Sequence, residues 1–245
     1  MSQLDGQHVL EVRDLQKSYR DGQGRFEVLD GLDLTLDRGE FTCILGRSGS
    51  GKSTLLKCIA GLEDYDGGEI LGNTNEIGYV FQEDRLLNWK TVDGNLRIAL
   101  ESEGVPKAEH DERIERYLDL VDLAKNADDY PLTLSGGMRQ RVSIARALVI
   151  EPEILLMDEP FSSLDEITAR DLRKRFLDIL TELDQSVLFV THNATEAAFL
   201  AETIVVLEHE PPAEVKTVID NPLPYPRDID SEEVQSLKRE IISYI

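Results

Sequence analysis

The sequence has few cysteines, few basic side chains and no long apolar run. Its 245 residues include 2 cysteines and 4 histidines, and none of these cluster at the spacing of a metal site. Cys43 and Cys58 fall in apolar segments, so we expect both to be small buried residues in a reducing compartment, without a disulfide. No apolar run reaches about 18 residues, and the start MSQLDGQHVLEV lacks the layout of a signal peptide. We therefore expect a soluble intracellular protein.

Basic residues are outnumbered by acidic ones. The chain has 26 Lys and Arg against 48 Asp and Glu, a net charge of −22. A field of this sign repels nucleic acid and anionic lipid, so we expect neither as a direct partner. Two explanations stay open: adaptation to a salt-rich cytoplasm, where screening weakens the self-repulsion, or an ordinary acidic cytosolic protein.

Length and composition favour one α/β domain. With 41% hydrophobic residues, the chain can bury a single core large enough for such a domain, with room for a smaller inserted subdomain. Two separate domains are less consistent with 245 residues.

A glycine-rich loop, Gly46-Arg-Ser-Gly-Ser-Gly-Lys-Ser-Thr54, separates an apolar run from a helical pattern. The apolar run Phe41–Leu45 predicts a buried strand, so the loop's N–H groups converge at the positive end of the following helix. This arrangement is typical of a triphosphate site, in which Lys52 reaches the phosphates and Ser53 ligates Mg²⁺. The alternative is a flexible surface loop. The predicted phosphate-binding residues are Gly46, Ser48, Gly49, Ser50, Gly51, Lys52, Ser53 and Thr54.

Hydrophobic periodicity predicts the remaining elements. The expected strands are His8–Val12 and Val28–Leu36, joined by a turn over Arg20–Arg25, then Ile77–Phe81, Ile154–Met157, Ser186–Val190 and Ile204–Leu207. The expected helices are Thr54–Ala60, Thr91–Glu101, Pro106–Leu123, one opened by Ser135, Glu166–Leu183 and a weak amphipathic one over Ser231–Tyr244. Gly61–Gly68 is predicted to be a cluster of turns.

Several further positions carry candidate chemistry, each with an ordinary alternative. Tyr19 offers a ring that can stack on a purine, or is a packed core tyrosine. Ser135 is predicted to cap a helix that begins with Gly136 and Gly137, whose exposed N–H groups could bind an anion. The alternative is an ordinary helix cap without a ligand. Arg85–Trp89 is either a buried anchor or an exposed patch for a partner.

Acidic residues and a histidine follow the later strands. Asp158 and Glu159 end an apolar run. There Asp158 could support Mg²⁺ and Glu159 could activate a water, or both carboxylates are simply solvated. His192 follows another apolar strand, where a lone histidine is usually structural.

In their order along the chain, these motifs resemble the ATP-binding-cassette family of ATPases over nearly the whole sequence. The six features are the phosphate loop, Gln82, Leu134-Ser-Gly-Gly137, the apolar strand ending in Asp158-Glu159, Ser162-Ser-Leu-Asp165 and His192. The resemblance implies a P-loop NTPase α/β core with a mostly parallel sheet, an N-terminal antiparallel β subdomain and an inserted α-helical subdomain. It implies one domain over residues 1–245, with a core of about 1–82 and 143–210, a helical subdomain of about 83–142 and a tail of about 211–245.

The resemblance also implies a role for each motif. Tyr19 would stack on adenine, Gln82 would sense the metal and the attacking water, and Glu159 would be the catalytic base. Asp158 would support the metal and His192 would contact the γ-phosphate. The following residues would complete the nucleotide site of a second copy in a head-to-tail homodimer: Ser135, Gly136, Gly137 and Asp165. The cofactors implied are ATP and Mg²⁺.

Within the family, the sequence is similar to the nitrate, sulfonate and taurine importers. The features are Arg85–Trp89, the signature LSGGMRQR, the segment Asp158–Asp165 and a short proline-containing tail. In such importers the ATPase drives a membrane permease, here expected to contact Arg85–Trp89, which receives cargo from an extracytoplasmic binding protein. The subunit would then lie on the inner face of the membrane. Arg47 and Asn88 depart from the residues usual at their positions.

Two other functions remain open from the sequence. One is a soluble cassette ATPase in nucleic-acid repair or translation, against which the net charge of −22 argues. The other is a nucleotide-gated binding module without turnover, which the presence of Glu159 and His192 disfavours.

Overall fold

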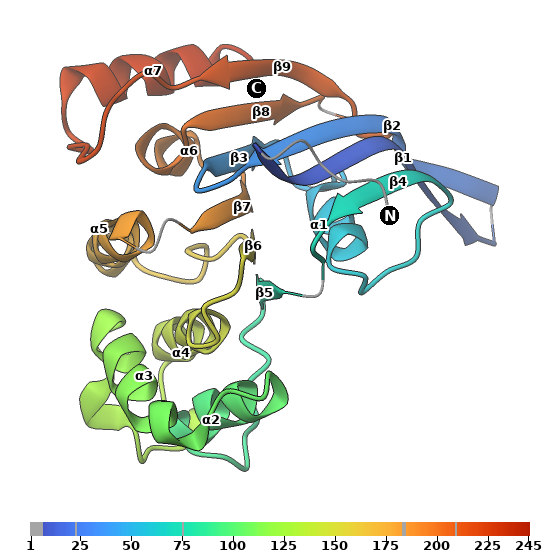
Figure 1. The fold of residues 1–245 in the computed structure, drawn as a ribbon. Coiled ribbons are helices and arrows are strands. Elements are labelled where there is room, and N and C mark those ends of the chain that lie inside the picture. Colours follow the sequence, from blue (N-terminus) through green and yellow to red (C-terminus); the bar gives the residue numbers. More distant parts are fainter. Residues whose placement is uncertain (1–6, 23, 75, 183–184, 209) are drawn as a thin grey trace.

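A computed structural model describes residues 7–22, 24–74, 76–182, 185–208 and 210–245 (Figure 1). The strands are β1 (His8–Asp21), β2 (Gly24–Asp37), β3 (Phe41–Leu45), β4 (Gly67–Gly72), β5 (Ile77–Val80), β6 (Ile154–Asp158), β7 (Ser186–Thr191), β8 (Thr203–Leu207) and β9 (Val215–Asp220). The α-helices are α1 (Lys52–Ile59), α2 (Val92–Ser102), α3 (Lys107–Leu120), α4 (Gly136–Leu148), α5 (Glu166–Glu182), α6 (Ala194–Leu200) and α7 (Glu232–Ile242). Two short 3-10 helices cover Ala124–Asn126 and Pro131–Thr133.

The central sheet has the strand order β5-β6-β7-β3-β8-β9. Its first five strands are parallel and β9 joins the edge antiparallel to β8. Every residue of β3, β6 and β7 is buried, as expected for strands covered on both faces. The mostly parallel α/β sheet predicted from the sequence is therefore confirmed.

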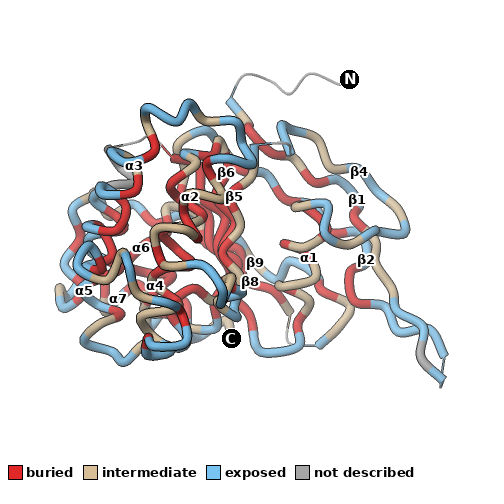
Figure 2. The backbone as a smooth tube through the Cα atoms, turned by 90° about the horizontal axis from the view of Figure 1, so that it is seen from below, coloured by how far each residue is buried: buried red, intermediate tan, exposed pale blue. Residues whose placement is uncertain are grey.

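Side chains of the central strands alternate between two hydrophobic cores. Cys43 and Met157 point to the side covered by α4, α5 and α6, whereas Ile44 and Leu156 point to the side covered by α1 and the N-terminal strands (Figure 1). In Figure 2 the buried residues concentrate in this central layer. Both cysteines are buried and free, Cys43 in one core and Cys58 in the other, as predicted.

The N-terminal strands form a separate antiparallel sheet of order β2-β1-β4. The predicted hairpin is present, but its strands are longer than expected: β1 runs to Asp21 and pairs with β2 from Gly24. Because this sheet packs against α1, the end of the hairpin comes to lie beside the phosphate loop. Gln23, in the predicted turn, is outside the described residues.

Helices α2, α3 and α4, here called the helical arm (residues 92–148), lie together beyond β5 (Figure 1). Their apolar residues, among them Leu96, Tyr117 and Val142, belong to the same core as the sheet face they cover. Thr91 caps α2 by accepting a hydrogen bond from Gly94 N, and Ser135 caps α4 by accepting one from Met138 N. The cap predicted at Ser135 is confirmed.

The predicted helix Pro106–Leu123 is too long. Helix α3 begins after Pro106 and ends at Leu120, because Asp122 adopts a left-handed conformation with φ of 56°. Leu123 N donates to Leu118 O at 2.8 Å and Asp122 N donates to Asp119 O at 3.0 Å, which together form a Schellman motif. An aspartate occupies the position usually held by glycine, so the sequence carries no clear stop signal.

Two strands, one α-helix and the two short 3-10 helices were not predicted. Strand β4 begins inside the predicted turn cluster, β9 lies in the predicted C-terminal tail, where no strand was expected, and α6 follows His192. Helix α5 begins at Glu166 as predicted, and the residue expected to end it, Leu183, is outside the described residues.

The tail after β9 crosses the C-terminal end of α6 before it forms α7. We call residues Asn221–Arg227 the tail strap. Asn221 Nδ2 donates to Ala198 O at 3.0 Å and Ala201 O at 2.7 Å, and the Tyr225 hydroxyl donates to Leu200 O. Arg227 Nη1 donates to Phe199 O at 3.1 Å and Ala201 O at 2.7 Å. Side chains of the strap therefore satisfy the last three carbonyls of α6 and that of its C-cap residue, Ala201, which a helix end leaves unpaired.

Candidate functional site

The predicted phosphate loop connects β3 to α1, and its backbone requires glycine. Gly49 and Gly51 have φ of 87° and 91°, in the left-handed region, and Gly51 is the N-cap residue of α1. A Cβ on Gly46 would lie 2.7 Å from Ser50 Oγ. The loop thus turns tightly enough to present its N–H groups at the N-terminus of α1.

Lys52 is buried under this loop. Its Nζ donates to Gly46 O and Arg47 O, both at 2.8 Å, which uses two of its three donors. Burial lowers the pKa of Lys52, and the carboxylates of Glu159 and Asp158 act in the opposite sense. The remaining donor is suited to a phosphate oxygen.

Ser53 and Asp158 bring two oxygens together beside the lysine. Ser53 Oγ donates to Asp158 Oδ1 at 2.8 Å. Burial raises the pKa of Asp158, and the hydrogen bond from Ser53 opposes this. A hydroxyl and a carboxylate fit a magnesium ion that takes most of its ligands from phosphate and water. Among the described residues, no group of three or more His, Cys, Asp or Glu side chains is placed so that it could hold a metal ion.

A cavity of about 350 Å³ connects the loop to residues far apart in the sequence. The lining residues are Tyr19, Phe26, Val28, Ser48, Gly49, Gly51, Lys52, Ser53, Thr54, Gln82 and Glu159. The structure thus brings together nine of the predicted site residues. Gly46 and Ser50 do not line the cavity, and Ser50 is fully buried.

Phe26 and Val28 are lining residues that sequence reasoning missed. Phe26 is the cross-strand partner of Tyr19 in the β1–β2 hairpin, so two aromatic rings flank the cavity. Tyr19 is 40% exposed, its hydroxyl hydrogen-bonds the Glu63 carboxylate, and Lys17 Nζ lies 5.0 Å from the centre of its ring. Counting outward from the predicted turn would have paired Tyr19 with Phe26 and identified this wall.

Glu159 follows β6 in a strained conformation, with φ of 47°. Its N–H donates to Val190 O at 3.0 Å, and its Oε2 lies 3.1 Å from His192 Nδ1. The neighbouring β7 therefore supplies the carbonyl that holds the backbone of Glu159, and the residue directly after β7, His192, contacts the Glu159 side chain. Such strain in a non-glycine residue is typical of functional sites.

Besides Gly46, Ser50, Asp158 and His192, four more predicted residues do not line this cavity: Ser135, Gly136, Gly137 and Asp165. They are close to one another, since a Cβ on Gly137 would lie 3.1 Å from Leu164, the neighbour of Asp165. Asp165 Oδ1 accepts a hydrogen bond from Thr168 N at 3.0 Å, which caps α5 and holds the pKa of Asp165 below its ordinary value. Within one copy, these residues do not reach the cavity beside Lys52.

Gln82 lines two cavities at once. On its other side is a groove of about 500 Å³ between residues 82–88 and the beginning of α4, where Gly136 and Arg139 lie. Arg139 pairs with Asp84 at 2.8 Å, and Arg146 Nη1 donates to Arg85 O at 2.9 Å. Helix α4 therefore holds the segment that begins at Gln82.

The segment Arg85–Trp89 combines the two alternatives left open by the sequence. Leu86 is buried in the core of the helical arm, whereas Trp89 is 72% exposed. The leucine is a buried anchor and the tryptophan is exposed at the surface.

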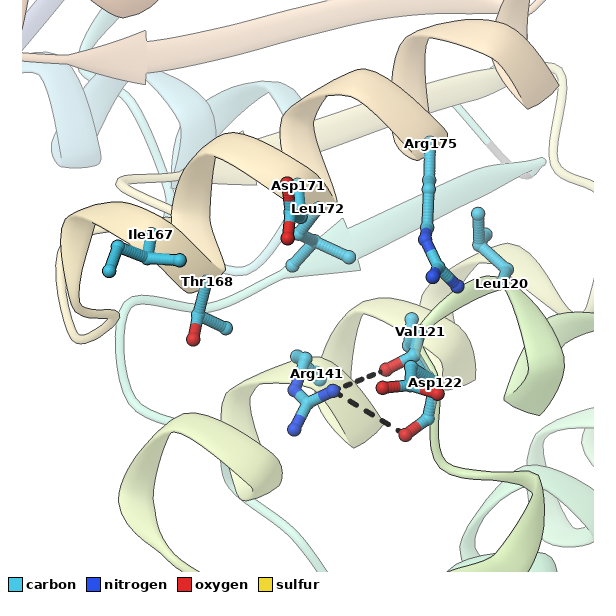
Figure 3. A pocket seen from close by; sticks show the side chains of 9 residues that line it. All are labelled: Leu120, Val121, Asp122, Arg141, Ile167, Thr168, Asp171, Leu172 and Arg175. Atoms are coloured by element: carbon cyan, nitrogen blue, oxygen red, sulfur yellow. Dashed lines mark hydrogen bonds between the residues drawn. The ribbon is translucent and has the colours of Figure 1, made fainter.

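A separate cleft of about 180 Å³ lies between the helical arm and α5 (Figure 3). Arg141 Nη1 donates there to Val121 O at 2.7 Å, and Asp171 and Arg175 line the opposite side on α5 (Figure 3). None of the predicted site residues lines this cleft. It marks the boundary between α5 and the arm.

No helix within the described residues is long and apolar enough to span a membrane.

Comparisons with known proteins agree with the site geometry. The family model described as ABC transporter matches residues 29–162. The aliphatic sulfonates import ATP-binding protein SsuB of Bacillus cereus is 36% identical, over 96% of this chain and 94% of its own length. The nitrate import ATP-binding protein NrtD of Synechocystis is 38% identical, over 94% of this chain and 89% of its own length.

Among solved structures, a dimeric ATP-binding cassette in a post-hydrolysis state with ADP and Pi bound superposes with a TM-score of 0.77. It is 29% identical, and the match covers 88% of this chain and 100% of that one. A family model matching more than half of the chain, together with relatives above one third identity over nearly its full length, settles the family. The chain belongs to the ABC transporter family, as an ATP-hydrolysing subunit.

Proposed function

We propose that this ATPase powers the import of a small anion through a membrane permease, as one of two copies paired head to tail around two ATP. The relatives named for sulfonate and nitrate import support uptake of such an anion. A dimeric neighbour bound to ADP and Pi supports the pairing. The observation that carries the proposal is that Lys52, Glu159 and Tyr19 line one cavity while Ser135 and Asp165 lie outside it, free to complete the site of another copy.

Nucleotide binding would use the two ends of the cavity. Tyr19 and Phe26 offer aromatic faces for the adenine ring, and the loop N–H groups with Lys52 surround the phosphates. Ser53, Asp158 and Gln82 would hold Mg²⁺, which supplies neutralisation of the phosphate charge when bound.

Hydrolysis would depend on Glu159 and His192. The Glu159 carboxylate accepts a proton from the attacking water, and His192, 3.1 Å away, keeps that carboxylate oriented and reaches the γ-phosphate. Positioning supplies most of the acceleration, since phosphoryl transfer needs little covalent help from the protein.

The signature end of α4 would bind the γ-phosphate held by the other copy. The bare N–H groups at Gly136 and Gly137, with the helix dipole, favour a negative charge at that position. Loss of the γ-phosphate removes this charge from the interface, so the two copies separate. Hydrolysis is thereby converted into movement.

The groove beside Gln82 would receive a helix of the permease. Its position next to both the nucleotide cavity and α4 would couple the occupancy of the site to the permease. Trp89, with its exposed ring near this groove, would contact the permease as an aromatic anchor. This contact would keep the subunit on the inner face of the membrane, and a binding protein outside would deliver the cargo.

Purification from native membranes tests this proposal. We expect the tagged chain to co-purify with a multispanning permease and Trp89→Ala to lose that partner while retaining its own ATPase activity. Tyr65→Ala, an exposed aromatic residue outside both cavities, is the matched control. Recovery of nucleic acid or ribosomes in place of a permease would favour the soluble alternative, which the net charge of −22 disfavours.

A further inference from the structure

Arg173, in the middle of α5, is a buried charge outside the nucleotide cavity. The residue is 1% exposed, although arginine is rarely buried without partners. Removing a guanidinium from water costs several kcal/mol unless carboxylates and hydrogen bonds compensate it. Its neighbours Asp171 and Arg175 face the cleft between α5 and the helical arm (Figure 3), so Arg173 lies on the other side of the helix.

Two carboxylates from different parts of the site meet this guanidinium. Arg173 Nη1 and Nη2 each lie 3.3 Å from an oxygen of Glu166, the residue directly after Asp165. Nη2 also lies 3.7 Å from Glu196 Oε1. Glu196 is on α6 and is 5% exposed, whereas the Glu166 side chain is 72% exposed. One link is therefore at the surface and the other is deep in the protein.

From Glu196 the contacts continue to the residues on both sides of His192. Thr191 Oγ1 donates to Glu196 Oε2 at 2.7 Å, and the same hydroxyl accepts a hydrogen bond from Asn193 N at 3.1 Å. His192 in turn contacts Glu159. A continuous polar chain thus runs from the beginning of α5 to the proposed catalytic pair.

A cavity of about 150 Å³ lies along this chain. Glu159 and His192 line it together with Ser162, Arg173 and Glu196. Arg173 Nε is buried and, within the described part of the protein, has no hydrogen-bond partner. The guanidinium is thus bordered by open space and keeps an unused donor, which lets it follow a shift of the loop it is paired with.

We propose that Arg173 is a positioning residue that couples the loop Ser162–Asp165 to His192. The inference rests on the proposed function, in which that loop faces the second copy and His192 orients Glu159. When the second copy holds the loop in place, the Glu166 carboxylate holds the Arg173 guanidinium in position. Arg173 then holds the side chain of Glu196 and, through Thr191, the turn that carries His192. Each copy then reaches full turnover only when its neighbour is docked.

The surface link gives a first test that spares the fold, because Glu166 is exposed. We expect Glu166→Ala to unfold like the parent and to keep its KM for ATP within about twofold, while kcat falls about tenfold, since small displacements of reacting groups are costly. Arg175→Met, on the opposite face of α5, is the matched control and should keep parental kcat. A parental kcat in Glu166→Ala would overturn the coupling.

The buried link gives a second test. Arg173→Met with Glu196→Gln removes both buried charges and leaves an amide oxygen to accept from Thr191, so folding should be largely preserved. We expect the kcat of this double variant to be at least tenfold below the parental value. We also expect the NMR signal of the His192 ring to shift, and that signal can be assigned readily because the chain has only 4 histidines. A purely structural pair would show parental kcat and an unchanged ring signal.

A parallel measurement of the ATPase activity of Glu159→Gln distinguishes failure of the proposed function from failure of the role proposed for Arg173. If Glu159→Gln keeps parental ATPase activity, the proposed catalytic role is wrong. If Glu159→Gln is inactive while both coupling variants are fully active, only the role of Arg173 is wrong.

Discussion

The residues that touch the phosphates could be predicted individually, whereas their neighbours could not. Lys52, Ser53 and Glu159 belong to local patterns whose chemistry is readable in a few consecutive letters. Phe26 and Val28 enter the same cavity through strand pairing, which depends on the register of a hairpin. Arg173 on α5 and Glu196 on α6 meet only in the folded chain, so no local sequence pattern indicates that they pair.

Tyr19 supplies a prediction at the scale of one side chain. Base stacking on an aromatic ring contributes about 1–3 kcal/mol, so Tyr19→Ala should raise the KM for ATP about tenfold and leave kcat at saturation near the parental value. Steady-state kinetics with ATP measures both constants. Tyr65→Ala, which removes a ring of the same 40% exposure outside the cavity, should change neither. Equal KM values for the two variants would refute stacking at Tyr19.

Glu196 supplies a prediction on pH. Burial raises its pKa above the ordinary 4.5, with Thr191, Arg173 and His192 opposing the shift and Glu166 adding to it. The folded state therefore holds this proton more tightly than the unfolded chain, and the stability from Glu196 is present below pH 4.5 and lost as pH rises through the folded value. As pH rises, the unfolding free energy of Glu196→Gln should therefore increase relative to that of the parent protein. Urea denaturation at several pH values above 4.5 measures both free energies. A difference between variant and parent that does not change with pH would contradict the raised pKa of Glu196.

At the scale of whole elements, the long periodic segments were predictable and the irregular connections were not. The central strands are continuous apolar runs and the phosphate-loop helix follows directly from its motif. Helix α3 ends early because Asp122 takes a conformation that the sequence gives no reason to expect. Strand β9 is an edge strand with exposed residues on one face, so its pattern is too weak to separate it from an irregular tail.

The tail strap supplies a prediction about α6. Arg227 is buried and donates to three carbonyls, those of Leu223, Phe199 and Ala201. Arg227→Met removes the side-chain donor to Leu223 O and Phe199 O, whereas Ala201 O still accepts from Asn221. At about 1–3 kcal/mol for each buried group, the variant should lose about 3 kcal/mol of unfolding free energy. Urea denaturation measures the loss. Arg239→Met, an arginine on α7 outside the strap, should change stability little. Equal losses in the two variants would show that the strap does not stabilise α6.

At the scale of the whole molecule, charge is the least ordinary property. Self-repulsion at a net charge of −22 is screened over about 10 Å at about 0.1 M salt and over about 3 Å at about 1 M. If the acidic composition is an adaptation to salt, the unfolding free energy should rise clearly between these concentrations of KCl. Equal stability at both would favour the ordinary acidic protein.

The central claim is that two copies share two nucleotides, each copy completing the other's site. It predicts that Ser135→Arg, which places a bulky side chain at the signature end of α4, prevents pairing and leaves nucleotide binding in the copy's own cavity intact. Glu159→Gln should instead bind nucleotide and remain paired without hydrolysing it, because the proton acceptor is lost while every binding group remains.

The most direct measurement is therefore the mass of Glu159→Gln in solution with Mg²⁺ and ATP, at the salt concentration where the protein is most stable. Sedimentation should show a monomer of 27.6 kDa without nucleotide and a particle of twice that mass with it, and adding Ser135→Arg should abolish the heavier species. A nucleotide-loaded Glu159→Gln that remains monomeric would contradict the account.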